Sequence, residues 1–283
     1  MALLGKRNEL KVVREASPGF YLDGENLGEI LLPGRYMPEG GKPGDTLDVF
    51  VYRDSEDRLV ATTETPYAMV GDFAFLRIVE VKPNIGAFLD WGLEKDLLLP
   101  RRELGGFRNE GDWVVVYISI DEKSDRIVAS AHLNAGFSRT PPPYVKEQPV
   151  KLLIYGETPL GFNAIVDNTY RGLVFRSDLA SPLIIGQYIN GFVRSVRSDG
   201  KLDLALDRSG FGRIAPLTEK IIETLKVNGG RMLYHDNSTP EEIRMAFGVS
   251  KKAFKQAIGT LYRNRRIRID AEGIEVSTED QES

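Results

Sequence analysis

The sequence predicts a mainly β protein, with several small barrels in tandem and an α+β domain at the C-terminal end. Three observations support this fold class. A strand-rich pattern occurs three times at constant spacing, and the hydrophobic period changes from that of a strand to that of a helix near Ile214. The length of 283 residues suffices for about two to four domains. Because 42% of the residues are hydrophobic, the chain has enough apolar material for folded cores.

A threefold repeat organises the chain up to about residue 211. Each repeat opens on an apolar strand, closes on an alternating one, and has Gly, Pro, Asn and Asp between its strands. About five strands per repeat suit a small closed barrel of the OB type. We expect barrels over residues 1–65, 66–140 and 147–211. Two landmark glycines recur at one separation: Gly19 and Gly44, Gly86 and Gly111, Gly161 and Gly186.

The second repeat resembles a known RNA-binding domain. Gly86-Ala-Phe-Leu-Asp90 precedes a Leu-Leu pair, and Gly111-Asp112 opens a β-rich run. This pattern is similar to the S-one domain, the repeat named after the first protein of the small ribosomal subunit. The resemblance implies that the first glycine begins the second strand. It also implies that an exposed aromatic, and a histidine ending the third strand, help to form the nucleic-acid face.

The repeats match the aromatic position of this motif and depart from it elsewhere. Phe88 fits the aromatic position in the second repeat, and Tyr21 fits it in the first. The acid of the third repeat comes late, at Asp167, which predicts a longer or bulged second strand. The residue before the landmark glycine, usually aromatic, is Pro18, Ile85 or Leu160. The histidine position holds Pro33, Pro100 or Phe175.

The C-terminal domain, expected over residues 213–278, combines three helices with a hairpin. The first helix places Leu217, Ile221, Ile222 and Leu225 on one face and ends at Gly229-Gly230. Thr239, with Pro240 after it and Glu242 three residues on, begins the second helix. Ser250 caps the third, after a turn of the helix-turn-helix type. The runs 267–270 and 274–276 form a hairpin, which completes a winged helix.

Charge is distributed unevenly along the chain. The net charge is −4, so any phosphate-binding surface must be local. Between Thr239 and Ile269 eight basic residues face two acids, a net of +6, whereas six acids and no base follow from Asp270 onward. We expect a basic patch on the winged helix beside a disordered acidic tail at 279–283.

The whole arrangement, three S-one-like barrels and a winged helix, resembles the conserved virulence factor B family of bacterial RNA-binding regulators. The most specific stretch is Ser238-Thr-Pro-Glu-Glu-Ile, followed by Phe247-Gly-Val-Ser-Lys-Lys-Ala-Phe and the helix after it. The resemblance covers about residues 3–277. It implies RNA binding and an influence on gene expression, without a known cofactor.

Each candidate binding residue also has a structural interpretation. An aromatic after the landmark glycine can stack on a base or face the barrel core, and a double arginine at a strand end can bind phosphate or only be solvated. The lysines of the third helix lie opposite Phe254 and Ile258, so they can face a nucleic acid, another protein or another barrel. The candidates are Tyr21, Phe88, Arg101, Arg102, Phe162, Phe175, Arg176, Lys251, Lys252, Lys255, Arg263, Arg265 and Arg266.

Enzymatic chemistry finds little support. The chain has no cysteine, which excludes disulfides and thiolate metal sites, and its two histidines, His132 and His235, have no metal-ligand partner at a useful spacing. Asp23, Asp90 and Asp167 recur in separate barrels and cannot form a paired-carboxylate site. No long apolar run suggests a membrane span, and the first residues lack the apolar core of a signal peptide. We expect a cytoplasmic protein without cofactor, metal or catalytic residues.

Two functions from different classes follow. The first is an RNA-binding, non-enzymatic regulator that engages single-stranded or A/U- or G-purine-rich RNA of unspecified sequence through its barrels and winged helix. The alternative is a DNA-binding transcription regulator that acts through the winged helix. A nuclease is disfavoured because the sequence contains no visible acidic metal cluster.

Overall fold

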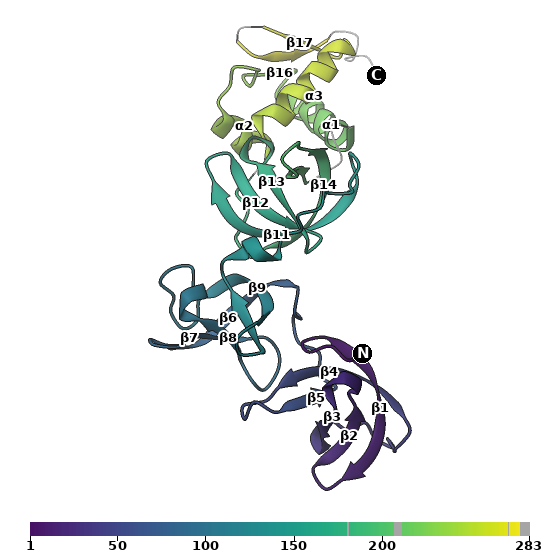
Figure 1. The fold of residues 1–283 in the computed structure, drawn as a ribbon. Coiled ribbons are helices and arrows are strands. Elements are labelled where there is room, and N and C mark those ends of the chain that lie inside the picture. The colour runs from purple at the N-terminus through teal and green to yellow at the C-terminus, as the bar shows by residue number, and fades with distance from the viewer. Residues whose placement is uncertain (180, 207–210, 271, 278–283) are drawn as a thin grey trace. The chain divides into compact units, whose positions relative to one another are not determined.

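The computed structural model describes residues 1–179, 181–206, 211–270 and 272–277. The chain divides into two compact units, Met1–Phe137 and Ser138–Ser283. The first unit contains two β-barrels, and the second contains a third barrel and a helical domain (Figure 1). The acidic tail expected at 279–283 lies outside the described residues.

The three barrels share one topology. If the strands of each barrel are counted from one to five, their order around every barrel is 1-2-3-5-4, closed between the first and fourth. The third and fifth strands are parallel, whereas the other neighbours are antiparallel. Five strands closed in this way form the OB-type barrel that the sequence predicts, so the fold class is confirmed.

The strand bounds follow the threefold repeat. Barrel 1 consists of β1 (Arg7–Ala16), β2 (Gly19–Asp23), β3 (Glu29–Pro33), β4 (Thr46–Arg53) and β5 (Leu59–Thr62). Barrel 2 consists of β6 (Phe73–Lys82), β7 (Gly86–Asp90), β8 (Leu97–Pro100), β9 (Trp113–Asp121) and β10 (Arg126–Ser130). Barrel 3 consists of β11 (Pro149–Thr158), β12 (Gly161–Val166), β13 (Tyr170–Phe175), β14 (Tyr188–Val196) and β15 (Leu202–Ala205). The second strand of barrel 3 is one residue longer than its counterparts, as the late Asp167 suggested.

The first landmark glycine of each repeat begins the second strand, as the resemblance implied. Gly86 has a φ of +143°, and a Cβ built on it would overlap the carbonyl oxygen of Leu99 on β8. In the same way, a Cβ on Gly19 would overlap the carbonyl oxygen of Leu32, and a Cβ on Gly161 would overlap that of Val174. Only glycine allows this close approach of two backbones, which explains why the residue recurs.

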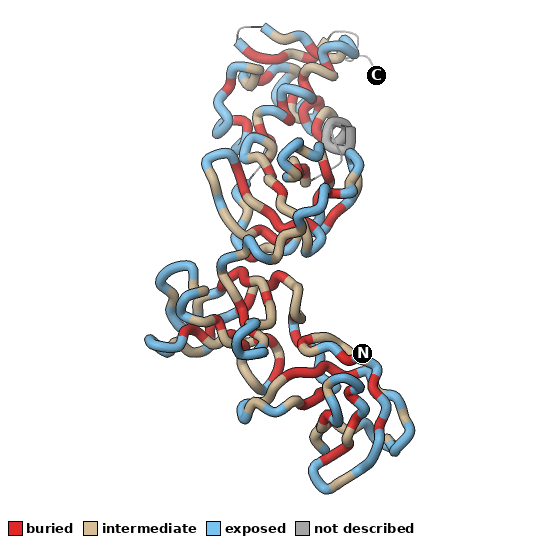
Figure 2. The backbone as a smooth tube through the Cα atoms, viewed as in Figure 1, coloured by how far each residue is buried: buried red, intermediate tan, exposed pale blue. Residues whose placement is uncertain are grey.

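Side chains alternate between the interior and the surface of each barrel. Figure 2 shows the alternation as buried and exposed positions that succeed each other along the strands. On β7, Ala87 and Leu89 are buried in the core, and Phe88 between them is half-buried. This period of two fixes which residues of a strand can meet a ligand.

The C-terminal domain contains the helices and strands of a winged helix. Its elements are α1 (Phe211–Val227), β16 (Arg231–Met232), α2 (Pro240–Phe247), α3 (Lys251–Arg263), β17 (Ile267–Ile269) and β18 (Ile274–Val276). Thr239 and Glu242 form the capping box that the sequence predicts at the start of α2. Ser250 caps α3 by accepting from the amide of Ala253. The three short strands form one sheet in the order β16-β18-β17.

The two barrels of the first unit share a continuous core. Trp91, from the loop between β7 and β8, is 2% exposed and stands edge-on to Phe50 of barrel 1, with ring centroids 5.7 Å apart. The Trp91 indole donates to the carbonyl oxygen of Lys95 at 2.6 Å. The Lys95 ammonium in turn donates to the carbonyls of Arg53 and Asp54, at 3.0 and 2.7 Å. Burial lowers the pKa of Lys95, because the charged form loses water contacts.

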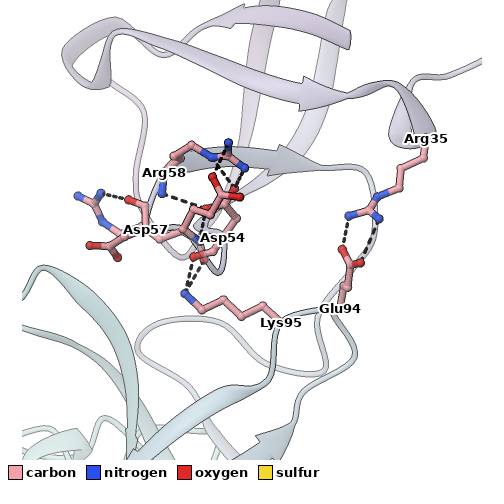
Figure 3. Close-up of polar contacts among 8 residues, drawn as sticks. Arg35, Asp54, Asp57, Arg58, Glu94 and Lys95 are labelled. Carbon is pink, nitrogen blue, oxygen red and sulfur yellow. Dashed lines mark hydrogen bonds and ion pairs between the residues drawn. The ribbon is translucent and has the colours of Figure 1, made fainter. Parts of the chain in front are cut away.

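Ion pairs at the margin of this contact fix the two barrels further. Arg35 of barrel 1 binds Glu94 through the two terminal nitrogens, Nη1 and Nη2, of its guanidinium group, beside the Lys95 contact (Figure 3). The turn between β4 and β5 meets the turn between β9 and β10 through two reciprocal pairs, Arg53 with Asp125 at 2.8 Å and Arg126 with Asp57 at 3.1 Å. Because the first two barrels share a hydrophobic core and are joined by these ion pairs, they form one unit.

Candidate nucleic-acid interface

The candidate face of each barrel is formed by its second and third strands. We call these surfaces, on β2–β3, β7–β8 and β12–β13, the strand 2–3 faces. The residue two places after the landmark glycine lies on the surface of the face: Tyr21, Phe88 and Asn163. The residue one place after it is buried: Phe20, Ala87 and Phe162.

Phe162 is therefore misplaced among the candidate binding residues. It is 1% exposed and belongs to the core of barrel 3. Because side chains alternate along a strand, its position corresponds to Phe20 and Ala87 and not to Tyr21 and Phe88. The guanidinium group of Arg176 lies over the ring, 5.2 Å from its centroid. A base cannot stack on Phe162 in this fold.

The aromatic of the third strand occurs only in barrel 3. Phe175 ends β13 and lies directly across from Gly161 in the strand register, where Pro33 and Pro100 lie across from Gly19 and Gly86. Phe175 is half-buried. Barrel 3 thus offers its ring from the third strand, whereas barrels 1 and 2 offer theirs from the second.

A cationic side chain lies over each of the three half-buried rings. The Arg14 guanidinium lies 3.6 Å from the Tyr21 ring centroid, the Lys82 ammonium 4.9 Å from that of Phe88, and the Arg197 guanidinium 5.8 Å from that of Phe175. The pattern of candidate residues did not include these cations. The hairpin register gives a signal for two of them, because Arg14 lies opposite Tyr21, and Lys82 opposite the landmark Gly86.

The cations differ in how firmly they are held. Arg14 binds Glu29 at 2.7 Å, and this hydrogen bond raises the pKa of Arg14. Lys82 pairs with Glu80 at 3.0 Å, and both side chains are nearly half exposed. Exposed pairs of this kind contribute little to stability and can exchange for a phosphate oxygen. A ring and a mobile cation together can hold a base and its phosphate.

The candidate arginines near the strand ends are exposed but partly engaged. Arg101 and Arg102 lie in the short helix η3 (Arg101–Glu103), and Arg102 binds Asp121 at 2.9 Å. Arg176 begins the equivalent helix η5 (Arg176–Asp178) and binds Glu157 at 2.7 Å. All three follow the third strand of their barrel directly, and a phosphate could replace the carboxylate partner of Arg102 or Arg176.

Lys252 contacts barrel 3 within the second unit. Its ammonium lies 3.1 Å from a carboxylate oxygen of Asp178, and α3 packs against η5. Arg194 of β14 binds the same carboxylate. Burial acts to raise the pKa of Asp178, but hydrogen bonds from Arg194 and Lys252 outweigh it and hold that pKa below its ordinary value. Lys252 thus follows the alternative in which the third helix holds another barrel.

The other basic candidates of the winged helix stay at the surface. We call Lys251, Lys255, Arg263, Arg265 and Arg266 the basic strip. Lys255, Arg263 and Arg265 are exposed, and Lys251 and Arg266 are half-buried. Within the described part of the chain, no carboxylate lies within ion-pair distance of Lys255 or Arg265. Lys255 and Arg265 therefore carry positive charge available to an anionic partner.

No three His, Asp or Glu side chains among the described residues lie close enough together to hold a metal ion. None of the helices in the described ranges is both long enough and apolar enough to cross a membrane.

These features define a multidomain protein built from domains of nucleic-acid-binding type. A model of the S1 domain matches residues 4–64, which is barrel 1, and a model of the CvfB-like winged helix domain matches residues 219–276. The S1 match falls on barrel 1, although the second repeat preserves the motif most visibly. Barrels 2 and 3 share its strand order.

Relatives extend the likeness over most of the chain. The chain is 26% identical to the protein named Uncharacterized protein YitL of Bacillus subtilis, over 93% of this chain and 90% of that protein. It is 22% identical to Conserved virulence factor B of Staphylococcus aureus, over 95% and 92%. A crystal structure of a multidomain protein with nucleic acid binding domains from Streptococcus pneumoniae covers 96% of this chain at 26% identity, with a TM-score of 0.45. The two family models and the two named relatives confirm the resemblance inferred from the sequence.

Proposed function

We propose that this protein binds single-stranded RNA, without catalysis, through the strand 2–3 faces of its barrels and the basic strip of its winged helix. The observation that carries the proposal is the repeated pairing of a half-buried ring with a cation: Tyr21 with Arg14, Phe88 with Lys82, and Phe175 with Arg197. An unpaired base can stack on such a ring while the cation beside it binds the phosphate, and this arrangement suits a single strand whose bases are free.

The contact of Lys252 favours RNA over duplex DNA. A helix-turn-helix domain reads the major groove with the N-terminal residues of its recognition helix. In this chain α3 packs against η5 of barrel 3, and Lys252, the second residue of α3, binds Asp178. The end of the helix that would enter the groove is thus engaged within the protein. Arg263 and Arg265, at the last residue of α3 and just after it, are exposed and stay available to a flexible strand.

The regulatory role rests on the relatives. Proteins named Conserved virulence factor B match nearly the whole chain, and the winged helix matches the CvfB-like model. We extend the proposal to a post-transcriptional regulator of bacterial gene expression that acts in the cytoplasm. Crosslinking to cellular RNA with peptide-level mapping would test this role, and crosslinks confined to abundant RNA without effect on transcript levels would contradict it.

Binding is tested by titrating fluorescent single-stranded RNA and duplex DNA at one stated salt concentration. The double variant Phe88→Ala, Phe175→Ala should weaken RNA binding by about 2–6 kcal/mol, because stacking contributes about 1–3 kcal/mol per base. Trp113→Ala is the matched control, since Trp113 is 56% exposed on β9, which β6 and β10 separate from the β7–β8 face. Unchanged affinity in the double variant excludes these stacking sites, and tighter binding of duplex DNA favours the DNA-binding alternative.

A further inference from the structure

A pocket of about 260 Å³ opens within the first unit, between its two barrels. Barrel 1 contributes the turn between β4 and β5, with Ser55 and Asp57. Barrel 2 contributes Phe88 of β7 and Leu98 of β8, so the pocket adjoins the strand 2–3 face of barrel 2. We call it the junction pocket. Figure 3 shows the turn of barrel 1 with Asp54, Asp57 and Arg58, and the Lys95 side chain that reaches it.

The junction pocket is preformed because its walls are fixed on both sides. Trp91, Tyr52 and Leu97 form apolar lining and are almost fully buried. The Lys95 ammonium binds two carbonyls of barrel 1, and the pair of Arg126 with Asp57 closes one side. A ligand would therefore enter without ordering these elements, which reduces the cost of binding.

The size and lining of the junction pocket suit one planar base. Phe88 lines the pocket, is half-buried and has Lys82 over its ring, so the same ring belongs to the pocket and to the strand 2–3 face. A strand that follows the β7–β8 face would pass this ring, and one unpaired base could turn inward beside it. Single-stranded RNA pays no unpairing cost for such a movement.

Asp96 gives the pocket a preference among the four bases. Asp96 is one of the lining residues, and no described residue forms a hydrogen bond or an ion pair with its carboxylate. Burial, together with the nearby charges of Asp90 and Glu80, raises the pKa of Asp96, as expected for a carboxylate without a partner. Two acceptor oxygens on one rigid group are best satisfied by two adjacent N–H donors.

Only guanine presents such a pair of donors on its Watson–Crick edge, at N1 and at the exocyclic amine. Adenine and cytosine offer one amine beside an acceptor nitrogen, and uracil offers one N–H between two carbonyl oxygens that would repel a carboxylate. We propose that the junction pocket binds one guanine base of single-stranded RNA, with Phe88 stacking at the mouth and Asp96 accepting from N1–H and the amine. This proposal rests on the RNA binding proposed above.

The test compares full-length protein with fluorescent seven-nucleotide RNAs, uridine throughout except for a central guanine, adenine or inosine. The guanine RNA should bind about tenfold more tightly than the adenine RNA, as expected for a good bidentate contact. Inosine, which lacks the exocyclic amine, should lie between them. Asp96→Asn should bring the guanine-to-adenine ratio close to one, whereas Glu39→Gln, which removes an exposed charge from barrel 1, should leave it unchanged.

The outcomes separate this proposal from the general one. Failure of every RNA to bind would contradict the proposed function itself. Binding without preference for guanine, or a preference that survives in Asp96→Asn, would overturn the junction pocket alone. Fluorescence gives a second readout, because Trp91 and Trp113 are the two tryptophans of the chain. In a Trp113→Phe protein the guanine RNA should quench Trp91 more than the adenine RNA does, and equal quenching would also overturn the proposal.

Discussion

At the scale of single residues, the landmark glycines differ in what they require. Gly86 lies where a side chain would overlap the backbone of β8. Gly111 also has a positive φ, of +88°, but a Cβ there would meet no atom within 4 Å. The first glycine therefore serves the close approach of two strands, and the second serves only the turn that leads into β9.

This difference predicts unequal effects of one substitution. Gly86→Ala should lower the free energy of unfolding by more than about 3 kcal/mol. The new side chain would push β8 away, and the backbone would also be strained at a positive φ that only glycine adopts easily. Gly111→Ala should cost about 1–2 kcal/mol, the strain of a positive φ by itself. Urea denaturation followed by tryptophan fluorescence measures both, and equal losses would show that the overlap at Gly86 is relieved cheaply.

The residue scale also shows how far the sequence determines the candidate site. Strand alternation, counted from the landmark glycine, places Tyr21 and Phe88 on the surface and Phe162 in the core. The signal that corrects Phe162 was thus present in the sequence. The partner of Lys252 was not, because Asp178 lies 74 positions away in the chain and only the folded unit brings the two together.

At the scale of elements, the loop between β7 and β8 holds the first two barrels together. Trp91 fills the contact, and its neighbours Glu94 and Lys95 bind barrel 1. Local signals predicted the barrels and the helix caps, since a cap depends on residues close in sequence. The same signals could not predict which loop joins two barrels, because that contact depends on shape complementarity between distant segments.

The two tryptophans give a matched test of this loop. Trp91→Ala should lower the free energy of unfolding of the first unit by about 3–5 kcal/mol, the usual cost of removing a large buried aromatic. Trp113→Ala should cost less than about 1.5 kcal/mol, since Trp113 is exposed and its ring makes a tilted contact with Phe75. Urea denaturation followed by circular dichroism measures both variants, and similar losses would contradict the role of Trp91 as the joining residue.

The contact between η5 and α3 should depend on pH. The pKa of Asp178 is lowered in the folded protein, so its contribution to stability is complete above the ordinary value of about 3.9 and is lost as the pH falls through the lowered pKa. At pH 6 Asp178→Asn should weaken the contact by about 1 kcal/mol, since Lys252 is half exposed to solvent.

Hydrogen exchange of η5 and of the first turn of α3 measures this contact. The wild type should be better protected than Asp178→Asn at pH 6, and the difference should close as the pH falls below about 3.9. Asp199→Asn serves as the control, because Asp199 also has a lowered pKa but pairs with Lys201 within one turn of barrel 3. A difference between wild type and Asp178→Asn that persists in acid would show that protonation of Asp178 does not control the contact.

At the scale of the whole molecule, the uneven charge determines how binding should respond to salt. A net charge of −4 cannot attract RNA over the whole surface, so the electrostatic part of the affinity must come from local cations. The basic strip supplies them on the winged helix, and Lys82 and the flanking arginines supply them on the barrels. The affinity for RNA should therefore fall with salt, with a slope that counts the phosphates contacted.

This dependence separates charged contacts from stacking. The double variant Lys255→Gln, Arg265→Gln should reduce the slope of log K against log salt by about 1.4, because each lost phosphate contact on a single strand contributes about 0.7. Phe88→Ala should lower the affinity equally at every salt concentration and leave the slope unchanged, since stacking releases no counterions. The control Lys42→Gln, Lys146→Gln removes the same charge from exposed positions outside the basic strip, and it should leave the slope close to that of the wild type. If the strip variant kept the wild-type slope, the winged helix would take no part in holding the strand, and the barrels alone would carry the binding.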